Sequence, residues 1–326
     1  MPEFSPTQIA VPFFVLAVLA EMIWARFRAR DAYEPKDTLT SLAFGLGSTV
    51  SGALFSGFAA ALFIAAYEYR LFDLGPDGNR EWWAVWWAWP LCFVLDDLKY
   101  YWVHRAGHRI RWMWAAHVNH HSSQHYNLST ALRQTWTGAF TFGLLFALPL
   151  VLLGFHPAMI AIAGGFNLVY QFWIHTEAIG RMPNWFEAVM NTPSHHRVHH
   201  ATNPRYLDRN YAGVFIIWDK MFGTFEAERD DETIRYGIIK QLGSFNLLYC
   251  VFHEWIGMIS DIWRAPWRHK LSYLLREPGW SHDGSRETSD MIRHRWRTRI
   301  GESRQAQLPE NSVSNKDGIA KPAKPA

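Results

Sequence analysis

The sequence predicts an all-α fold: a polytopic, helical integral membrane protein with a histidine-rich helical cap that faces the cytosol. Three observations predict it: long apolar stretches, an uneven distribution of Lys and Arg in the loops between them, and the gathering of twelve of the 16 histidines between residues 104 and 200. Of the 326 residues, 49% are apolar and 19% are charged, and the net charge is +3. This balance argues against a disordered chain and against a nucleic-acid partner.

The first two apolar stretches are predicted to cross the membrane. Residues 9–24 contain one charged residue, Glu21, and are followed by Arg26, Arg28 and Arg30. Because the basic residues follow the apolar run instead of preceding it, we interpret this stretch as an uncleaved anchor and not as a signal peptide. Residues 39–67 carry no charge and exceed the roughly 20 residues that a helical span needs.

Three further apolar regions complete the predicted membrane part. Residues 82–103 begin with several tryptophans and end with acidic residues, as a span that returns to the interface would. Residues 138–155 and 157–173 predict a hairpin of two short spans or a re-entrant pair. Residues 245–263 are interrupted by a histidine and a glutamate, so we expect an interfacial or partly buried helix there.

The loop charges predict the orientation. The loop at 26–37 carries three arginines and a lysine, whereas the loop at 68–81 carries two arginines and four acids. Since cytoplasmic loops are enriched in Lys and Arg, the first loop is predicted to be cytoplasmic. Counting spans from there brings every histidine cluster to the cytoplasmic side. The membrane is either a bacterial inner membrane or the endoplasmic reticulum.

Histidines recur at spacings of three and four, which place imidazoles on one face of a helix. No paired-cysteine motif is present, and imidazole suits iron, zinc, copper or nickel. A closed structural site needs only four ligands, so this larger set predicts two metal ions with open positions. His175, close to the end of a predicted span, and His195 are further candidates. The predicted ligands are His104, His108, His117, His120, His121, His196, His199 and His200.

The pattern HxxxH, HxxHH, HxxHH in a chain with several spans resembles the fatty acid hydroxylase and sterol desaturase superfamily. The longer segments around these motifs look most like its alkylglycerol monooxygenases. They occur in order within a region that makes up about half of the chain, and they are far more specific than the histidine motifs alone. The matching segments are residues 97–108, 115–134, 166–177, 191–228 and 277–280.

The resemblance implies a non-haem di-iron monooxygenase that uses O₂ to hydroxylate a C–H bond of a lipid, and in the alkylglycerol branch cleaves an ether lipid. By similarity, the histidines of the three motifs are iron ligands and His175 is an additional one. Two positions depart from that branch: Arg109 stands in place of an acid, and His125 replaces another. The first acid is a candidate partner of a pterin. The electron source therefore stays open between tetrahydrobiopterin and an electron-transfer protein.

Other residues are expected around this centre. Asp97 lies seven residues before His104, so it could accept a proton from a ligand ring, although a helix-end acid is an equally good interpretation. The weaker candidates for such a role are Glu177, Asp208 and Asn210. The candidates for the substrate mouth are Tyr126, Asn127 and Arg133.

Residues 1–300 are predicted to form a single membrane-embedded domain with its catalytic core at about 96–228, and residues 301–326 a disordered tail. Two alternatives to the ether-lipid activity remain. One is a sterol or fatty acyl hydroxylase or desaturase that uses an electron-transfer protein. The other is a non-enzymatic metal-binding or transport protein, in which the histidines would line the spans.

Overall fold

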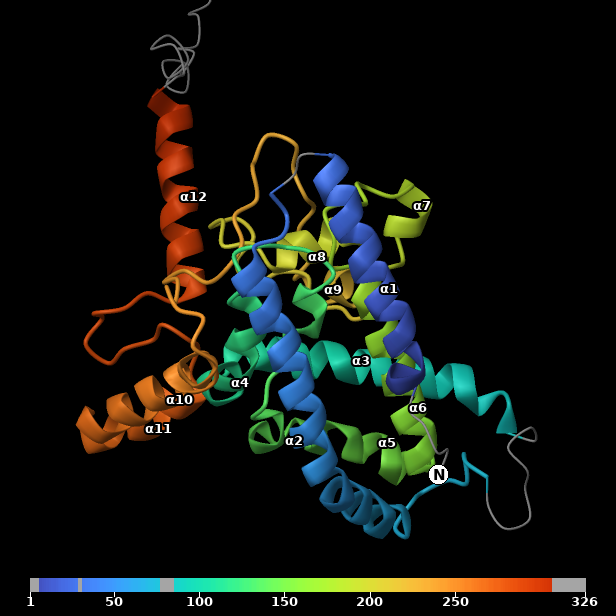
Figure 1. The fold of residues 1–326 in the computed structure, drawn as a ribbon. Coiled ribbons are helices and arrows are strands. Elements are labelled where there is room, and N and C mark those ends of the chain that lie inside the picture. Colours follow the sequence, from blue (N-terminus) through green and yellow to red (C-terminus); the bar gives the residue numbers. More distant parts are fainter. Residues whose placement is uncertain (1–5, 29–30, 77–84, 307–326) are drawn as a thin grey trace, which may run out of the picture.

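The computed structural model describes residues 6–28, 31–76 and 85–306, and in these ranges the chain is helical without any strand (Figure 1). Two isolated β-bridges, Met190 with Phe215 and Ala201 with Tyr236, are the β contacts of the described part. The predicted all-α class is therefore confirmed there.

Two helices of the described part are long and apolar enough to cross a membrane: α1 (Pro6–Phe27) and α2 (Pro35–Tyr67). Both coincide with predicted spans. α2 begins where Glu34 caps the backbone N–H of Asp37, with Pro35 in the first turn, where a missing N–H costs nothing. Many apolar side chains of both helices point outward, which is the distribution that lipid favours.

The third predicted span differs from the structure. Helix α3 (Ala88–Arg109) starts and ends six residues later than expected, and it runs across α1 instead of along it (Figure 1). The tryptophans at 82 and 83 lie outside the described residues. Asp96 and Asp97 are buried among α3's neighbours, because α3 packs against α4 (Arg111–His121) and α6 (Pro157–Trp173). α3 thus forms the centre of the helical core.

The first half of the predicted hairpin is not one helix. Phe142 adopts a left-handed backbone conformation with φ 57°, which separates two short 3₁₀ turns. Apolar composition alone does not reveal such a break, because an apolar run is compatible with one continuous helix or with several short turns. The segment consists of η3 (Gly138–Thr141), η4 (Gly143–Ala147) and α5 (Leu148–Leu153).

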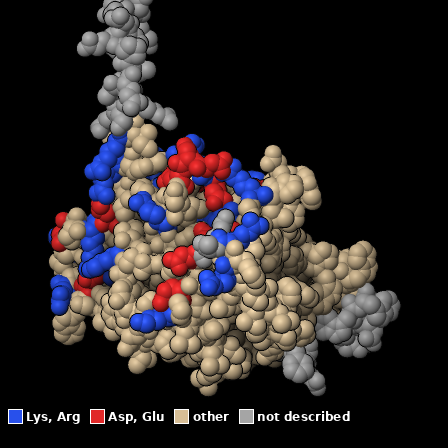
Figure 2. Space-filling model, turned by 45° about the horizontal axis from the view of Figure 1, so that its top comes forward, with Lys and Arg blue, Asp and Glu red and all other residues tan. Residues whose placement is uncertain are grey.

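Helix α10 (Leu247–Arg264) fits the expectation of a partly buried helix, with Cys250, Val251 and Met258 inward. Polar residues gather elsewhere: Figure 2 shows basic side chains along α12 (Ser289–Ala306) and across the adjoining loops, while the lower part of that face is uncharged. α12 continues past the predicted start of the tail, and residues 307–326 lie outside the described part. The remaining elements are η2 (Thr130–Leu132), α7 (Asn184–Glu187), α8 (Pro193–His199), α9 (Ile217–Met221), η5 (Trp267–His269) and α11 (Lys270–Leu275).

Candidate metal centre

The nine predicted ligand histidines converge on two neighbouring points. In each group, one ring nitrogen from every member lies within 4.8 Å of those of the other members. All of these side chains are buried except that of His117, which is half-buried. The first group is His104, His108, His117, His121 and His199, and the second is His120, His175, His196 and His200.

The HxxHH spacing divides each helix between the two groups. In α4, the residues four apart, His117 and His121, belong to the first group, and His120 belongs to the second. At α8 the assignment is reversed: the residues four apart, His196 and His200, belong to the second group, and His199 belongs to the first. A side chain at offset three lies about 60° around the helix from offset zero, so each motif bridges two adjacent sites.

Backbone carbonyls fix the protonation of several rings. The Nδ1 atom of His104 lies 2.7 Å from the Tyr211 carbonyl oxygen, and that of His199 lies 2.9 Å from the Arg209 carbonyl oxygen. A carbonyl oxygen only accepts, so these Nδ1 atoms carry the proton and the Nε2 atoms present lone pairs. His175 is held in the same way by the Gln171 carbonyl at 2.7 Å.

Two of the inward ring nitrogens have no hydrogen-bond partner. The Nε2 atoms of His108 and His199 are buried without any hydrogen-bond partner. Burial, followed by the charges of neighbouring imidazoles, lowers the pKa of His121 and His200 well below its usual value, so both rings are neutral. Converging neutral imidazoles with inward lone pairs are a donor set that fits a cation. The residues present therefore suit a metal ion in each group.

One of the expected acids contacts a ligand. Asp208 Oδ1 lies 3.2 Å from His108 Nδ1, and Arg109 lies 3.6 Å from the same carboxylate. Burial opposes ionisation of Asp208, but the hydrogen bond from His108 and the charge of Arg109 lower its pKa. A carboxylate at this ring nitrogen orients the imidazole and makes it a better ligand.

Asp97 does not contact the ring of a ligand histidine, which was the first of its two predicted roles. Its carboxylate accepts from the backbone N–H groups of Val214 (2.8 Å) and Phe215 (2.9 Å), and from the Trp218 indole (2.9 Å). No contact with a ligand ring occurs, because the Tyr211 carbonyl occupies the outer nitrogen of His104. Asp97 instead fixes the loop that follows Tyr211. The carbonyls of Tyr211, Arg209 and Gln171 were missed because a backbone atom leaves no signal in residue type.

Glu177 and Asn210, the other candidates for holding a ligand ring, also contact no ligand ring. Glu177 accepts a hydrogen bond from Tyr236 at 2.8 Å, and Asn210 donates to the His195 and Glu226 carbonyls. His195 lies outside both groups, with its Nε2 3.8 Å from Glu187. His195 precedes His196 by one residue on a helix, so its side chain points about 100° away from that of the ligand His196.

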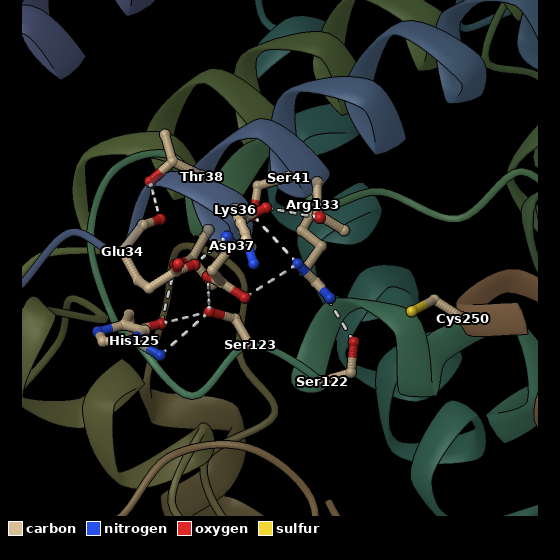
Figure 3. Close-up of polar contacts among 12 residues, drawn as sticks. Glu34, Lys36, Asp37, Thr38, Ser41, Ser122, Ser123, His125, Arg133 and Cys250 are labelled. Carbon is tan, nitrogen blue, oxygen red and sulfur yellow. Dashed lines mark hydrogen bonds and ion pairs between the residues drawn. The ribbon is translucent and has the colours of Figure 1, made fainter. Parts of the chain in front are cut away.

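The three mouth candidates are buried and line no opening to the ligands. Tyr126 donates to the Ile174 carbonyl at 3.0 Å, and its ring lies against His175 and His200. Asn127 donates to the Ala32 carbonyl. The Arg133 side chain lies between α2 and the end of α4 (Figure 3).

A cavity of about 750 Å³ reaches both groups from the side of α1 and α2. His104 and His117 of the first group and His120 and His175 of the second form its inner end. The outer walls come from residues 7–14 of α1 and 45–52 of α2, with Leu132 and Phe172 between. This volume is in the range of small-molecule sites, and the walls are mainly apolar.

Comparison with known proteins gives consistent matches. The profile described as Fatty acid hydroxylase matches residues 89–224. The chain is 40% identical to alkylglycerol monooxygenase of Homo sapiens and 38% identical to that of Xenopus tropicalis, over 83% of its own length in both cases. It is also 30% identical to a cholesterol 25-hydroxylase-like protein of Danio rerio, over 44% of this chain and 57% of that protein.

The two alkylglycerol monooxygenases are longer proteins. The chain covers 59% of the human protein and 58% of the frog protein, so it spans about three-fifths of their length. No solved structure matches the chain.

Proposed function

From the premise that this chain belongs to the fatty acid hydroxylase family, we propose that it is a membrane-bound, non-haem di-iron oxygenase that hydroxylates a C–H bond of a lipid. One observation carries the proposal: the apolar cavity joins both histidine groups to the two helices that are able to span a membrane. A lipid chain can therefore reach the reacting centre without leaving an apolar environment.

The substrate class we propose is an alkylglycerol ether lipid, supported by the similarity to alkylglycerol monooxygenases. Hydroxylation of the carbon next to the ether oxygen gives a hemiacetal, which breaks down to a fatty aldehyde and a glycerol derivative. One oxygen atom of O₂ enters the product, and the other leaves as water with two electrons and two protons from a reductant. Tetrahydrobiopterin and an electron-transfer protein are both suitable reductant classes.

The nine histidines would hold two iron ions, one in each group. Iron, when bound, supplies the O₂-dependent oxidation of an unactivated C–H bond, which side-chain acids and bases cannot perform. The chain's own residues orient the centre: the carbonyls of Tyr211 and Gln171 and the Asp208 carboxylate hold imidazole rings by their outer nitrogens. The apolar walls orient the lipid chain and exclude water.

We place the site on the cytoplasmic side of a polytopic domain, residues 1–300, with the catalytic core at 96–228. The basic residues after α1 and along α12 support this orientation. The segment from α10 through η5 to α11 would lie in the membrane surface, because it carries both exposed apolar side chains and basic ones. The apolar ones include Ile256, Ile259, Trp263, Trp267 and Leu271, and the basic ones Arg264, Arg268 and Lys270.

A second candidate is a sterol hydroxylase, favoured by the match to the cholesterol 25-hydroxylase-like protein. The deciding experiment incubates the detergent-purified, iron-loaded protein with an alkylglycerol, an acyl lipid and a sterol, each with O₂ and either reductant class. We expect aldehyde release from the alkylglycerol, with ¹⁸O from ¹⁸O₂ in the aldehyde when it is trapped promptly. A hydroxysterol alone would favour the second candidate. Full iron content without product from any lipid would contradict an oxygenase.

A further inference from the structure

A second cavity, of about 390 Å³, lies on the other side of the first histidine group. It is enclosed by the last turns of α3, the loop at 208–211, the turn after α9 and the first half of α12. No residue lines both this cavity and the apolar one. We propose that it binds a small polyanion that carries phosphate or several carboxylate groups.

The charges of the cavity do not balance. Five arginines and two aspartates line it. Arg109 pairs with Asp208, Asp290 and Glu277, the last of which does not line the cavity, and Arg293 pairs with Asp290. Among the described residues, the other three arginines have no carboxylate within 4.0 Å, so the cavity keeps an excess of positive charge that an anion would neutralise. These three are Arg105, Arg209 and Arg297.

The strongest single indication is the guanidinium of Arg209. One of its terminal nitrogens donates to the Gly223 carbonyl at 3.0 Å, but its Nε is buried without a hydrogen-bond partner. A buried donor without a partner is costly, and it is rare unless a ligand or water completes it. The other terminal nitrogen of Arg209 has no hydrogen-bond partner among the described residues and is not fully buried. An anionic oxygen in the cavity would accept from this nitrogen, while the exposed Arg297 contacts the same anion from α12.

The size and position of the cavity define the class of ligand. A volume of about 390 Å³ has room for a phosphate or diphosphate group with a small attached moiety, and the lining is mostly polar, so a lipid tail does not fit. Asp290, Arg293, His294 and Arg297 of the lining belong to α12, and Figure 2 shows basic side chains along that helix. Free phosphates and the phosphate of a lipid headgroup share the required chemistry.

The cavity also touches the metal-binding region. Asp208 lines it and contacts His108 at 3.2 Å, and Arg105 and Arg109 each follow a ligand of α3 by one residue. A bound anion would therefore compete with Asp208 for Arg109 and alter the partner of His108. The site does not depend on the proposed lipid oxidation, because binding can be measured without turnover.

The test is isothermal titration of the detergent-purified chain, residues 1–326, with pyrophosphate. We expect specific binding that Arg209→Gln or Arg297→Gln weakens about tenfold each, the loss expected for one charge-assisted hydrogen bond. Arg295→Gln is the matched control, because Arg295 lies on the same helix, pairs with Glu287 and does not line the cavity. Arg297 is exposed, so its variant remains informative if Arg209→Gln fails to fold.

Two outcomes would overturn the proposal: wild-type protein that does not bind pyrophosphate or a short-chain phosphatidic acid, or binding that all three variants retain unchanged. A competition arm identifies the source of the phosphate. Displacement of pyrophosphate by short-chain phosphatidic acid at lower concentration supports a lipid headgroup. If pyrophosphate is the stronger competitor, the result supports a soluble phosphate compound. Either result supports the proposed site.

Discussion

His120 and His175 face each other through Nε2 atoms that lie 3.2 Å apart, and the Nδ1 atom of each ring lies at a backbone carbonyl oxygen. With both Nδ1 atoms donating, neither Nε2 carries a proton. The short contact is therefore one between two lone pairs, which repel each other in the absence of a cation. The fold, through α4 and the end of α6, positions these nitrogens where a metal ion would relieve the repulsion.

Replacement of one ligand should remove one ion. We expect His175→Ala to reduce the iron content from about two ions per chain to about one, since only the second group loses a member. Mass spectrometry of the purified protein measures this directly. His195→Gln is the control, because His195 lies outside both groups, and it should keep both ions. Equal loss in the two variants would contradict the ligand assignment.

Asp208 should tune metal affinity without binding the metal. Asp208→Asn keeps the shape of the side chain but removes the charge that faces His108. We expect the affinity of the first group to fall by about 10- to 100-fold, the usual effect of losing such a partner. Competition with a chelator measures it, with the exposed Asp231→Asn as the control. An unchanged affinity would show that the carboxylate serves only Arg109.

The histidine positions were predictable because ligand spacing on a helix follows its period. Residues such as His117 and His121 must share a face wherever the helix lies. Asp97 was not predictable in the same way: its partners, Val214 and Phe215, are more than 100 residues away and are backbone groups. Tertiary packing, not local pattern, decides which polar atoms meet.

The positions of the apolar helices could be predicted from local composition, but the breaks within apolar runs could not. The uncharged stretch that became α2 was evident from its composition, since an apolar run longer than about 20 residues is typical of a membrane-spanning helix. The run at 138–155 has similar composition but breaks at Phe142, whose left-handed conformation is not indicated by residue type. Arg133 was expected at an opening, yet its charge is met inside the protein by Asp37.

Breaking the buried Arg133–Asp37 pair on one side only should be strongly destabilising. In Figure 3, the Arg133 guanidinium lies between Asp37 and Ser41 of α2 and Ser122 at the end of α4, with Arg133–Asp37 and Arg133–Ser122 distances of 3.3 and 3.0 Å. Arg133→Leu leaves the Asp37 carboxylate buried without its cation, so we expect a loss of about 3 kcal/mol in the free energy of unfolding.

The double variant Arg133→Leu/Asp37→Leu removes both charges and should recover much of this stability. Denaturant unfolding in detergent gives the comparison. The exposed pair Arg229–Asp231 supplies the control, and Arg229→Leu should leave the unfolding midpoint nearly unchanged. If Arg133→Leu leaves the unfolding midpoint as nearly unchanged as Arg229→Leu does, the Arg133–Asp37 ion pair does not hold α2 to the end of α4.

Membrane sidedness can be read from single cysteines, since Cys92 and Cys250 are both buried and should react slowly. Asp31→Cys and Ser285→Cys lie at exposed positions in the loop after α1 and in the loop before α12, and Glu68→Cys follows α2. In intact cells, a membrane-impermeant maleimide should label only Glu68→Cys. Labelling of position 31 from outside would reverse the proposed orientation.

The route of the lipid can be blocked on α2. Gly52 lines the apolar cavity, and an added Cβ there meets nothing within 4 Å, so Gly52→Phe can extend into the cavity without a backbone clash. Gly57 is equally open but does not line the cavity, which makes Gly57→Phe the matched control on the same helix. Both variants should keep their iron, because neither residue lies near the histidines in sequence or in either group.

We expect Gly52→Phe to lower kcat/KM for a long-chain alkylglycerol by at least about tenfold, because a wall that must accommodate the chain loses the volume of an aromatic ring. A short-chain analogue should be affected less, since it need not extend as far as α2. Gly57→Phe should resemble the unmodified protein with both substrates. Equal activity of the two variants on the long chain would mean that the lipid does not enter between α1 and α2, and that the apolar cavity is not its path to the histidines.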